Sequence, residues 1–364
     1  MSIPRAHSGI DNIKPHMVGL ARQSVPPAAI ALNSNESAFG PSPYAREAAR
    51  AASASMERYV ENVDSILSPA IAEAHGLDVN RITCGQGSDD LIARLVRGYL
   101  GPGLALMRSA NGYLKVPNYA HQANGAVIHV PDNNFTPSVD NMIAALNDSV
   151  KIVYLANPEN PAGTYLTGQE VRQLHAAMPN HALMILDCAY EEYVDAPDYE
   201  PGHRLVRDAS NVVTCRTFSK IHGLAGARVG WVYGPEDVID TAKCLALTFP
   251  IATPSLAAAL AALEDKAHTD FVRRENARLR TWLILELAGL GLNTIASQTN
   301  FVLIHMPDPG RSAEALDTAL RSRGVALRRM ASPAYRDHIR ITIGFQHELQ
   351  RALELIDQFV RGEI

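Results

Sequence analysis

The chain has 364 residues, of which 47% are hydrophobic, 20% charged and 6% aromatic, a composition typical of a folded globular protein rather than a disordered one. Its formal net charge of −5 and its lack of lysine- or arginine-rich runs argue against a nucleic-acid partner. No stretch approaches the roughly 18 apolar residues that span a bilayer, and residues 1–20 have no continuous apolar segment, so we expect no membrane anchor, no leader peptide and a cytoplasmic location.

Residues 1–40 are rich in Pro, Asn, Ser and Gly, which predicts an irregular arm that lies on another part of the protein. From about residue 81 to 250, short β-rich runs alternate with helical runs. Apolar stretches at 152–155 and 183–186 lack polar alternation, as is typical of strands covered on both faces. The sequence thus predicts an α/β fold in which helices flank a mostly parallel sheet. The expected strands lie at 81–84, 126–130, 151–156, 182–187, 212–216 and 229–233, and the expected helices at 88–100, 139–146 and 169–178.

The pattern changes after residue 250 to long helices rich in alanine and leucine, followed by alternating strands and helices. This indicates a second, smaller α+β domain, and a chain of this length usually needs more than one core. Here helices are expected at 255–263, 270–289, 313–323 and 348–361, and strands at 300–304 and 339–343. We therefore expect three parts: an N-terminal arm at 1–40 that joins the small domain, a large domain at 41–254 and a small domain at 255–364.

Four cysteines are widely spaced along the chain, at Cys84, Cys188, Cys215 and Cys244. They form no C-x-x-C pair and have no histidine at the spacing of a metal site. We expect buried free thiols in a reducing compartment and no metal.

A glycine-rich motif, GQGSDD at 85–90, follows an expected strand and begins an expected helix. Ligand groups gather at the carboxyl ends of strands in a doubly wound sheet, and backbone amides at a helix N-terminus can hold a phosphate. A polar cap in a glycine-rich turn also begins ordinary helices, so the motif alone leaves both interpretations open.

Two further motifs follow expected strands. NPENPAGT at 157–164 is rich in turn formers, and the amide of its Asn160 could donate into a site. Asp187 ends an apolar strand, and Tyr190 follows three residues later. A buried carboxylate is costly unless it is paired, although a helix N-cap would also explain this one.

Lys220 lies in TFSKIHGLAGAR at 217–228, directly after an expected strand. Hydroxyl groups and a glycine-bearing apolar loop flank it. Desolvation there could lower the pKa of the amine and make it a nucleophile toward a carbonyl, whereas most single lysines are only solvated.

The order of these motifs resembles the fold-type I enzymes that use pyridoxal 5'-phosphate (PLP), and more closely the histidinol-phosphate aminotransferase family. The matches extend from Leu32 to Gly344 and are highly specific for the fold and for PLP. The matching segments are LNSNE at 32–36, GPSP at 40–43, GQGSD at 85–89, NPENPAGT at 157–164, DCAY at 187–190, TFSKIHGLAGAR at 217–228, TNFV at 299–302 and RITIG at 340–344.

The resemblance implies a role for each matching catalytic residue. Lys220 would carry PLP as a Schiff base and then move the substrate α-proton. Asp187 would pair with the pyridinium nitrogen and keep the ring an electron sink. Tyr190 and Asn160 would hydrogen-bond the phenolate oxygen of PLP, and Tyr113 would stack on its ring.

The same resemblance assigns groups to the phosphate and to the substrate. Tyr59 would reach the cofactor phosphate of a neighbouring subunit, which implies a homodimer. Arg340 would bind the substrate α-carboxylate, Arg328 would be a second cation facing the substrate, and Asn35 would also contact the substrate. The residues expected around the phosphate are Gly87, Ser88, Asp89, Thr217, Ser219 and Arg228.

The chain departs from the family pattern mainly where substrates are chosen. Ser37-Ala38 replaces Asn-Pro, Val60-Glu61 replaces Pro-Asp, and Ala162 replaces threonine. These changes argue for a substrate other than histidinol phosphate itself.

We expect an aminotransferase that exchanges the amino group of an L-amino acid or a related amine with a 2-oxo acid. The amine would be histidinol-phosphate-like, aromatic or anionic. The alternatives are a PLP-dependent decarboxylase or lyase on the same scaffold, and a non-catalytic PLP-binding regulatory protein.

Overall fold

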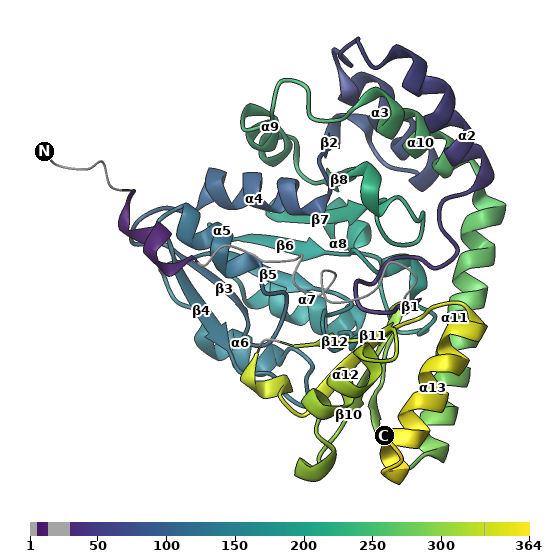
Figure 1. Cartoon of the computed structure of the whole chain (residues 1–364). Coiled ribbons are helices and arrows are strands. Elements are labelled where there is room, and N and C mark those ends of the chain that lie inside the picture. Colours follow the sequence, from purple (N-terminus) through teal and green to yellow (C-terminus); the bar gives the residue numbers. More distant parts are fainter. Residues whose placement is uncertain (1–5, 14–29, 331) are drawn as a thin grey trace, which may run out of the picture.

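The computed structural model describes residues 6–13, 30–330 and 332–364. A seven-stranded sheet forms the centre of the protein, in the order β2-β8-β7-β6-β5-β3-β4 (Figure 1). The pairs β3–β4, β3–β5, β5–β6 and β6–β7 are parallel, and β8 runs antiparallel to both of its neighbours. The mostly parallel sheet predicted from the sequence is confirmed. Its strands are β2 (Ile82–Gly85), β3 (Ala105–Ser109), β4 (Ala126–Val130), β5 (Val150–Ala156), β6 (Leu183–Asp187), β7 (Val212–Thr217) and β8 (Gly230–Tyr233).

Alternate residues of the central strands enter two separate cores, so helices cover both faces of the sheet. Ile152 and Tyr154 of β5 pack with residues of α4, α5 and α9. Val153 and Leu155 pack with residues of α3, α6, α7, α8 and α10 on the other face. The helices of this part are α2 (Pro43–Ala52), α3 (Val63–His75), α4 (Ser88–Tyr99), α5 (Val116–Gln122), α6 (Val139–Ala145), α7 (Gly168–Ala177), α8 (Gly202–Asp208), α9 (Glu236–Cys244) and α10 (Thr253–Glu264).

A smaller antiparallel sheet, in the order β12-β13-β10-β9, lies against the last three helices. β1 (Ile30–Ala31) pairs in parallel with β11 (Val325–Ala326), so the segment before residue 40 joins the C-terminal part. The proposed boundaries at 40 and 254 stay predictions, and residues 1–5 and 14–29 of the expected arm lie outside the described residues. The remaining elements are α11 (Lys266–Gly289), α12 (Ala313–Arg321), α13 (Gln346–Arg361), β9 (Thr294–Ile295), β10 (Phe301–His305), β12 (Arg328–Arg329) and β13 (His338–Thr342).

Some elements were not expected from the sequence. No helix was assigned between residues 41 and 80, where α2 and α3 form. Both carry ordinary start signals, because the Ser42 side chain caps α2 and the Asn62 side chain caps α3. The two-residue strands β1, β9, β11 and β12 are too short to produce a periodic pattern.

Two composition-based expectations can be compared with the structure. Cys84, Cys188 and Cys215 are buried, but Cys244 near the end of α9 is exposed, so the expectation of four buried thiols is wrong at that position. Among the described helices, none is both long and apolar enough to cross a membrane.

Candidate active site

A cavity of about 530 Å³ lies at the carboxyl ends of β5, β6 and β7, between the large sheet and the small one. That size suits a small organic ligand. All the residues predicted for the site line this cavity except Gly87 and Tyr59. The predicted residues at the cavity wall are Asn35, Ser88, Asp89, Tyr113, Asn160, Asp187, Tyr190, Thr217, Ser219, Lys220, Arg228, Arg328 and Arg340.

Asp187 is the last residue of β6 and is 7% exposed. Its Oδ2 accepts a hydrogen bond of 2.7 Å from the Tyr154 hydroxyl, on the neighbouring strand β5. Its Oδ1 has no hydrogen-bond partner within the described part of the chain. Burial raises the pKa of this carboxyl to about 6, although the Tyr154 hydrogen bond opposes the shift. The free oxygen can therefore accept from a cationic N–H group.

Lys220 lies in the turn that follows β7, so the strand delivers its amine to the cavity wall. Its Nζ donates to the backbone oxygen of Asn35 at 3.2 Å and lies 5.5 Å from the centre of the Tyr190 ring. The amine is thus held by a neutral carbonyl. A carbonyl ligand in the cavity can reach it without breaking an ion pair, since Lys220 forms none among the residues described.

The Tyr190 hydroxyl accepts two side-chain amides, from Asn35 at 3.0 Å and from Asn160 at 3.5 Å. Asn35 also bonds Thr342 of β13, through its backbone amide at 3.0 Å and its side-chain oxygen at 3.2 Å. Its backbone is left-handed, with φ of +54°, a conformation that asparagine tolerates better than most residues. Asn35 therefore connects the segment after β1 with both sheets.

The groups expected around a phosphate meet at one end of the cavity. The helix α4 begins at Ser88 after Gly87, whose φ is +85°, and no side chain caps its described N-terminus. Arg228 Nη1 donates to Ser219 Oγ at 3.3 Å, and its Nη2 donates to the Gln86 carbonyl at 3.4 Å. The guanidinium thus bridges the two loops. Thr217 Oγ1 donates to Ser219 Oγ at 2.9 Å and completes the cluster.

Arg340 of β13 and Arg328 of β12 are partners in register on adjacent strands. Arg340 is 6% exposed, and its Nη1 donates to Asn160 Oδ1 at 2.7 Å. Its Nε has no hydrogen-bond partner in the described chain, and neither arginine forms an ion pair with a described residue. Burial lowers the pKa of Arg340 to about 10, and the nearby Arg328 adds to the shift. Two neighbouring cations without a carboxylate partner among the described residues favour an anionic ligand.

Two predicted residues lie elsewhere. Gly87 is behind Arg228: a Cβ at Gly87 would stand 2.7 Å from the Arg228 Nη2 atom, so glycine leaves room for the guanidinium. Tyr59 is 74% exposed and stacks on Phe249 with ring centres 4.0 Å apart. Tyr59 is therefore a surface residue that does not line the cavity of its own chain.

Three residues that hold the site were not predicted. Tyr154 fixes Asp187, Thr342 fixes Asn35, and Asn300 donates to the Asn35 backbone oxygen at 3.1 Å. The tyrosine in the buried, mainly apolar strand β5 was a signal for Tyr154. The other two depend on contacts between segments that are about 265 and 307 residues apart, which no local pattern reveals.

The donor set of the cavity fits PLP. The unpaired Asp187 oxygen suits a pyridinium N–H, the Lys220 amine suits an aldehyde, and the uncapped start of α4 with Arg228 suits a phosphate dianion. Tyr113 lines the same cavity, and its hydroxyl donates to Asp89 at 3.3 Å.

Comparison with known proteins decides the family. A family model described as aminotransferase class I and II matches residues 27–356. The chain belongs to this family. The predicted fold type and enzyme class are confirmed, and the chain is a PLP-dependent aminotransferase.

Curated histidinol-phosphate aminotransferases match along nearly the whole chain. The histidinol-phosphate aminotransferase of Paramagnetospirillum magneticum is 40% identical over 361 residues, which cover 99% of each chain. The histidinol-phosphate aminotransferase of Nitrobacter winogradskyi is 41% identical, over 94% of this chain and 95% of that one.

Solved aminotransferase structures have the same fold. The histidinol-phosphate aminotransferase of Sinorhizobium meliloti, in complex with PLP, superposes with a TM-score of 0.91 at 28% identity, over 100% of this chain and 99% of that one. An aspartate aminotransferase of Thermus thermophilus with maleate has a TM-score of 0.83 at 23% identity, over 98% of this chain and 100% of that one, a likeness of fold alone. These comparisons give no support to the lyase and regulatory alternatives.

Proposed function

We propose that this aminotransferase takes an amine with an anionic tail as donor and a 2-oxo acid as acceptor, with histidinol phosphate as the first donor to test. The observation that carries the proposal is the in-register pair Arg328 and Arg340, which lines the cavity without a carboxylate partner among the described residues. A phosphate or carboxylate supplies the missing negative charge. The names of the relatives favour histidinol phosphate over the other amines, in spite of the altered substrate motifs.

PLP, when bound, supplies an aldehyde for the Lys220 amine and a cationic ring that draws electrons from the substrate α-carbon. Asp187 would hold the ring nitrogen in its protonated form through Oδ1, while Tyr154 keeps the other oxygen in place. Tyr190, oriented by Asn35 and Asn160, would donate to the ring oxygen.

The proton is moved by Lys220. With the substrate amine bound to the cofactor in its place, Lys220 would take the proton from the substrate α-carbon and deliver it to the cofactor carbon that carried the aldehyde. Arg340 binds the acceptor α-carboxylate with the guanidinium atoms that have only neutral partners or none. Arg328 binds the distal anion. Asn160 connects the cofactor-binding group with the carboxylate-binding group, since it contacts both Tyr190 and Arg340.

The chain acts as a homodimer in this proposal, and the second copy covers an apolar surface around Tyr59. Five exposed apolar side chains lie in α2, in the segment that follows it and in the segment before α10, and Tyr59 stacks on Phe249. An exposed apolar surface is typical of an interface. The five are Tyr44 at 71% exposed, Met56 at 67%, Tyr59 at 74%, Leu247 at 59% and Phe249 at 41%. Tyr59 would then reach the partner's cofactor phosphate. Light scattering should give twice the mass of one chain, and Met56→Glu should shift the mass toward the monomer and weaken PLP binding.

Two further statements belong to the same proposal. The chain divides into an arm at 1–40, a PLP-binding domain at 41–254 and a small domain at 255–364, which is supported by the separate apolar cluster of the small sheet. The enzyme acts in the cytoplasm, which is supported by its free cysteines.

The test is a half-reaction screen of the PLP-loaded enzyme. Histidinol phosphate should convert the bound cofactor to its amine form with release of a carbonyl product, and unphosphorylated histidinol should react about 100-fold more slowly. Equal rates for the two amines would remove the anionic-tail proposal. Release of carbon dioxide from an amino acid, with the cofactor aldehyde regenerated, would instead identify a decarboxylase.

A further inference from the structure

The start of α4 carries two carboxylates at the place proposed for the cofactor phosphate. Asp89 and Asp90 both lie in the first turn of α4. The start of a helix attracts anions, but two carboxylates beside it repel a phosphate dianion. Asp89 lines the cavity and accepts a hydrogen bond from Tyr113. The charge of Asp90 must be offset by another group.

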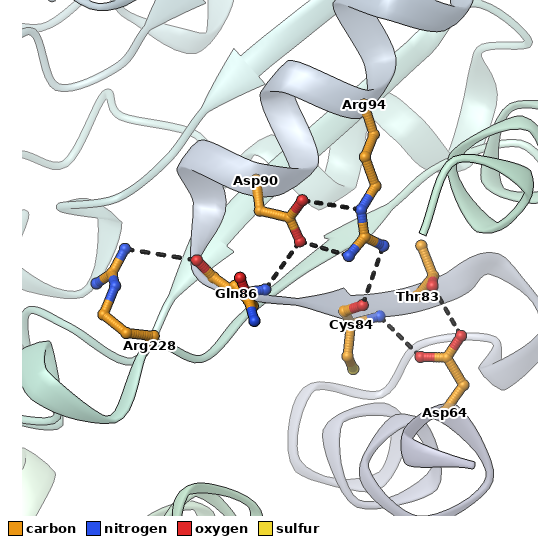
Figure 2. A network of polar contacts seen from close by, with 7 residues as sticks. All are labelled: Asp64, Thr83, Cys84, Gln86, Asp90, Arg94 and Arg228. Carbon is orange, nitrogen blue, oxygen red and sulfur yellow. Dashed lines mark hydrogen bonds and ion pairs between the residues drawn. The ribbon is translucent and has the colours of Figure 1, made fainter. Parts of the chain in front are cut away.

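Arg94 provides that offset from one helical turn further along. Its side chain is completely buried, and its guanidinium grips Asp90 at two points, with Nε 3.0 Å from Oδ1 and Nη2 bonded to Oδ2 (Figure 2). Its Nη1 also reaches the Cys84 carbonyl at 3.5 Å. A fork-to-carboxylate pair fixes both the position and the charge of Asp90.

Asp90 in turn fixes the glycine-rich turn. Its Oδ2 accepts the backbone amide of Gln86 at 2.9 Å, while the Gln86 carbonyl accepts from Arg228. Figure 2 shows Gln86 held between these two side chains. A Cβ at Gly85 would stand 2.6 Å from Asp90 Oδ2 and 3.1 Å from Arg94 Nη2, so the turn is shaped to the pair.

A second carboxylate anchors the strand before the turn. Asp64 of α3 accepts from the Thr83 hydroxyl at 2.7 Å and from the Cys84 amide at 2.8 Å. The end of β2 is therefore held from α3 and from α4, and the amides that follow Gly87 have little freedom to turn away from the cavity.

We propose that Asp90 and Arg94 are positioning residues for the phosphate of PLP. Asp90 aims the turn, and Arg94 cancels the charge that Asp90 would otherwise present to the phosphate. This inference rests on the proposed binding of the phosphate at α4. A pair that only stabilises its helix would act like Asp357 and Arg361, which have the same spacing and a 2.9 Å Nε–Oδ1 contact on α13.

The experiment compares the affinities of cofactor-free protein for PLP and for pyridoxal, which lacks the phosphate. Arg94→Met should weaken PLP binding about tenfold and change pyridoxal binding less than about twofold, because an uncompensated carboxylate repels only the phosphate. The double variant Asp90→Asn/Arg94→Met should recover most of the PLP affinity. Arg361→Met is the matched control and should leave both affinities unchanged.

The single variant Asp90→Asn keeps the inference testable if Arg94→Met does not fold. Asparagine retains an oxygen that can accept from the Gln86 amide, and the positive charge of Arg94 remains. PLP should therefore bind at least as tightly to this variant as to the wild type. Equal weakening of PLP and pyridoxal, or a double variant worse than Arg94→Met, would overturn the inference. If the unaltered chain binds pyridoxal as tightly as PLP, the proposed phosphate site itself is wrong.

Discussion

The two sides of the cavity differ in how their charges are paired. On the side of the large sheet, Asp187 is held by Tyr154, and Arg228 is held by Ser219 and the Gln86 carbonyl. On the side of the small sheet, Arg328 and Arg340 lie in register, and neither has an ionic partner among the described residues. The first side is organised in advance for one permanent ligand. The second keeps positive charge available for anions that enter and leave.

The largest expected effect is on the large-sheet side. Lys220→Ala should lower amino transfer by about 10⁴-fold, since Lys220 is the amine proposed to move the α-proton, and should abolish the absorption of lysine-bound cofactor. Lys243→Ala, an exposed lysine on α9, is the control. An unchanged lysine-bound absorption band in Lys220→Ala would assign the cofactor to another lysine. The large-sheet side would then not be the cofactor side as proposed.

Asp187→Asn should reduce turnover by about 10²- to 10³-fold while the cofactor still binds, because an amide does not keep the ring nitrogen charged. Rapid-mixing measurement of the half-reaction separates this loss from weaker binding. A loss below about fivefold would mean that the charge of the ring is set by a group other than Asp187.

The same carboxylate should change the pH dependence of stability in the cofactor-free protein. Burial raises the pKa of Asp187 from 3.8 to about 6, so the folded chain binds this proton more tightly than the unfolded chain. The stabilisation is complete below about pH 4 and is lost as the pH rises through 6. The free energy of unfolding of the wild type, relative to Asp187→Asn, should therefore fall by on the order of 3 kcal/mol from pH 4 to pH 7. A constant difference in urea denaturation would contradict the raised pKa.

The smallest effects belong to the small-sheet side and should appear in KM. Arg340→Gln should raise KM for the 2-oxo acid about 50-fold, and Arg328→Gln should raise KM for the amine about tenfold, with little change in the spectrum of the bound cofactor. Arg329→Gln, whose side chain pairs with Glu314 on the exposed face, is the control. If Arg328→Gln changed the cofactor spectrum, the small-sheet side would also act on the cofactor, and the proposed division between the two sides would be wrong.

The sequence predicted the large-sheet side better than the rest because its residues follow buried strands directly. Asp187 and Lys220 come at or just after the ends of β6 and β7, where strand patterns are strong. The contacts of Asn35 and Arg340 depend on two-residue strands and on pairing between distant segments, which are invisible to local periodicity. Helices α2 and α3 were missed although Ser42 and Asn62 signalled their starts.

The edge position of β12 has a consequence for how this enzyme can change over time. Arg328 lies on a two-residue strand at the border of the small sheet, half-buried, and bonds none of the residues that orient Lys220 or Asp187. A mutation there can alter which molecules are accepted while the reaction machinery and the packed interior stay intact. New substrate preferences can thus arise by single substitutions in β12 that leave catalysis and stability unchanged. We expect the sequences of natural relatives to vary most at this strand.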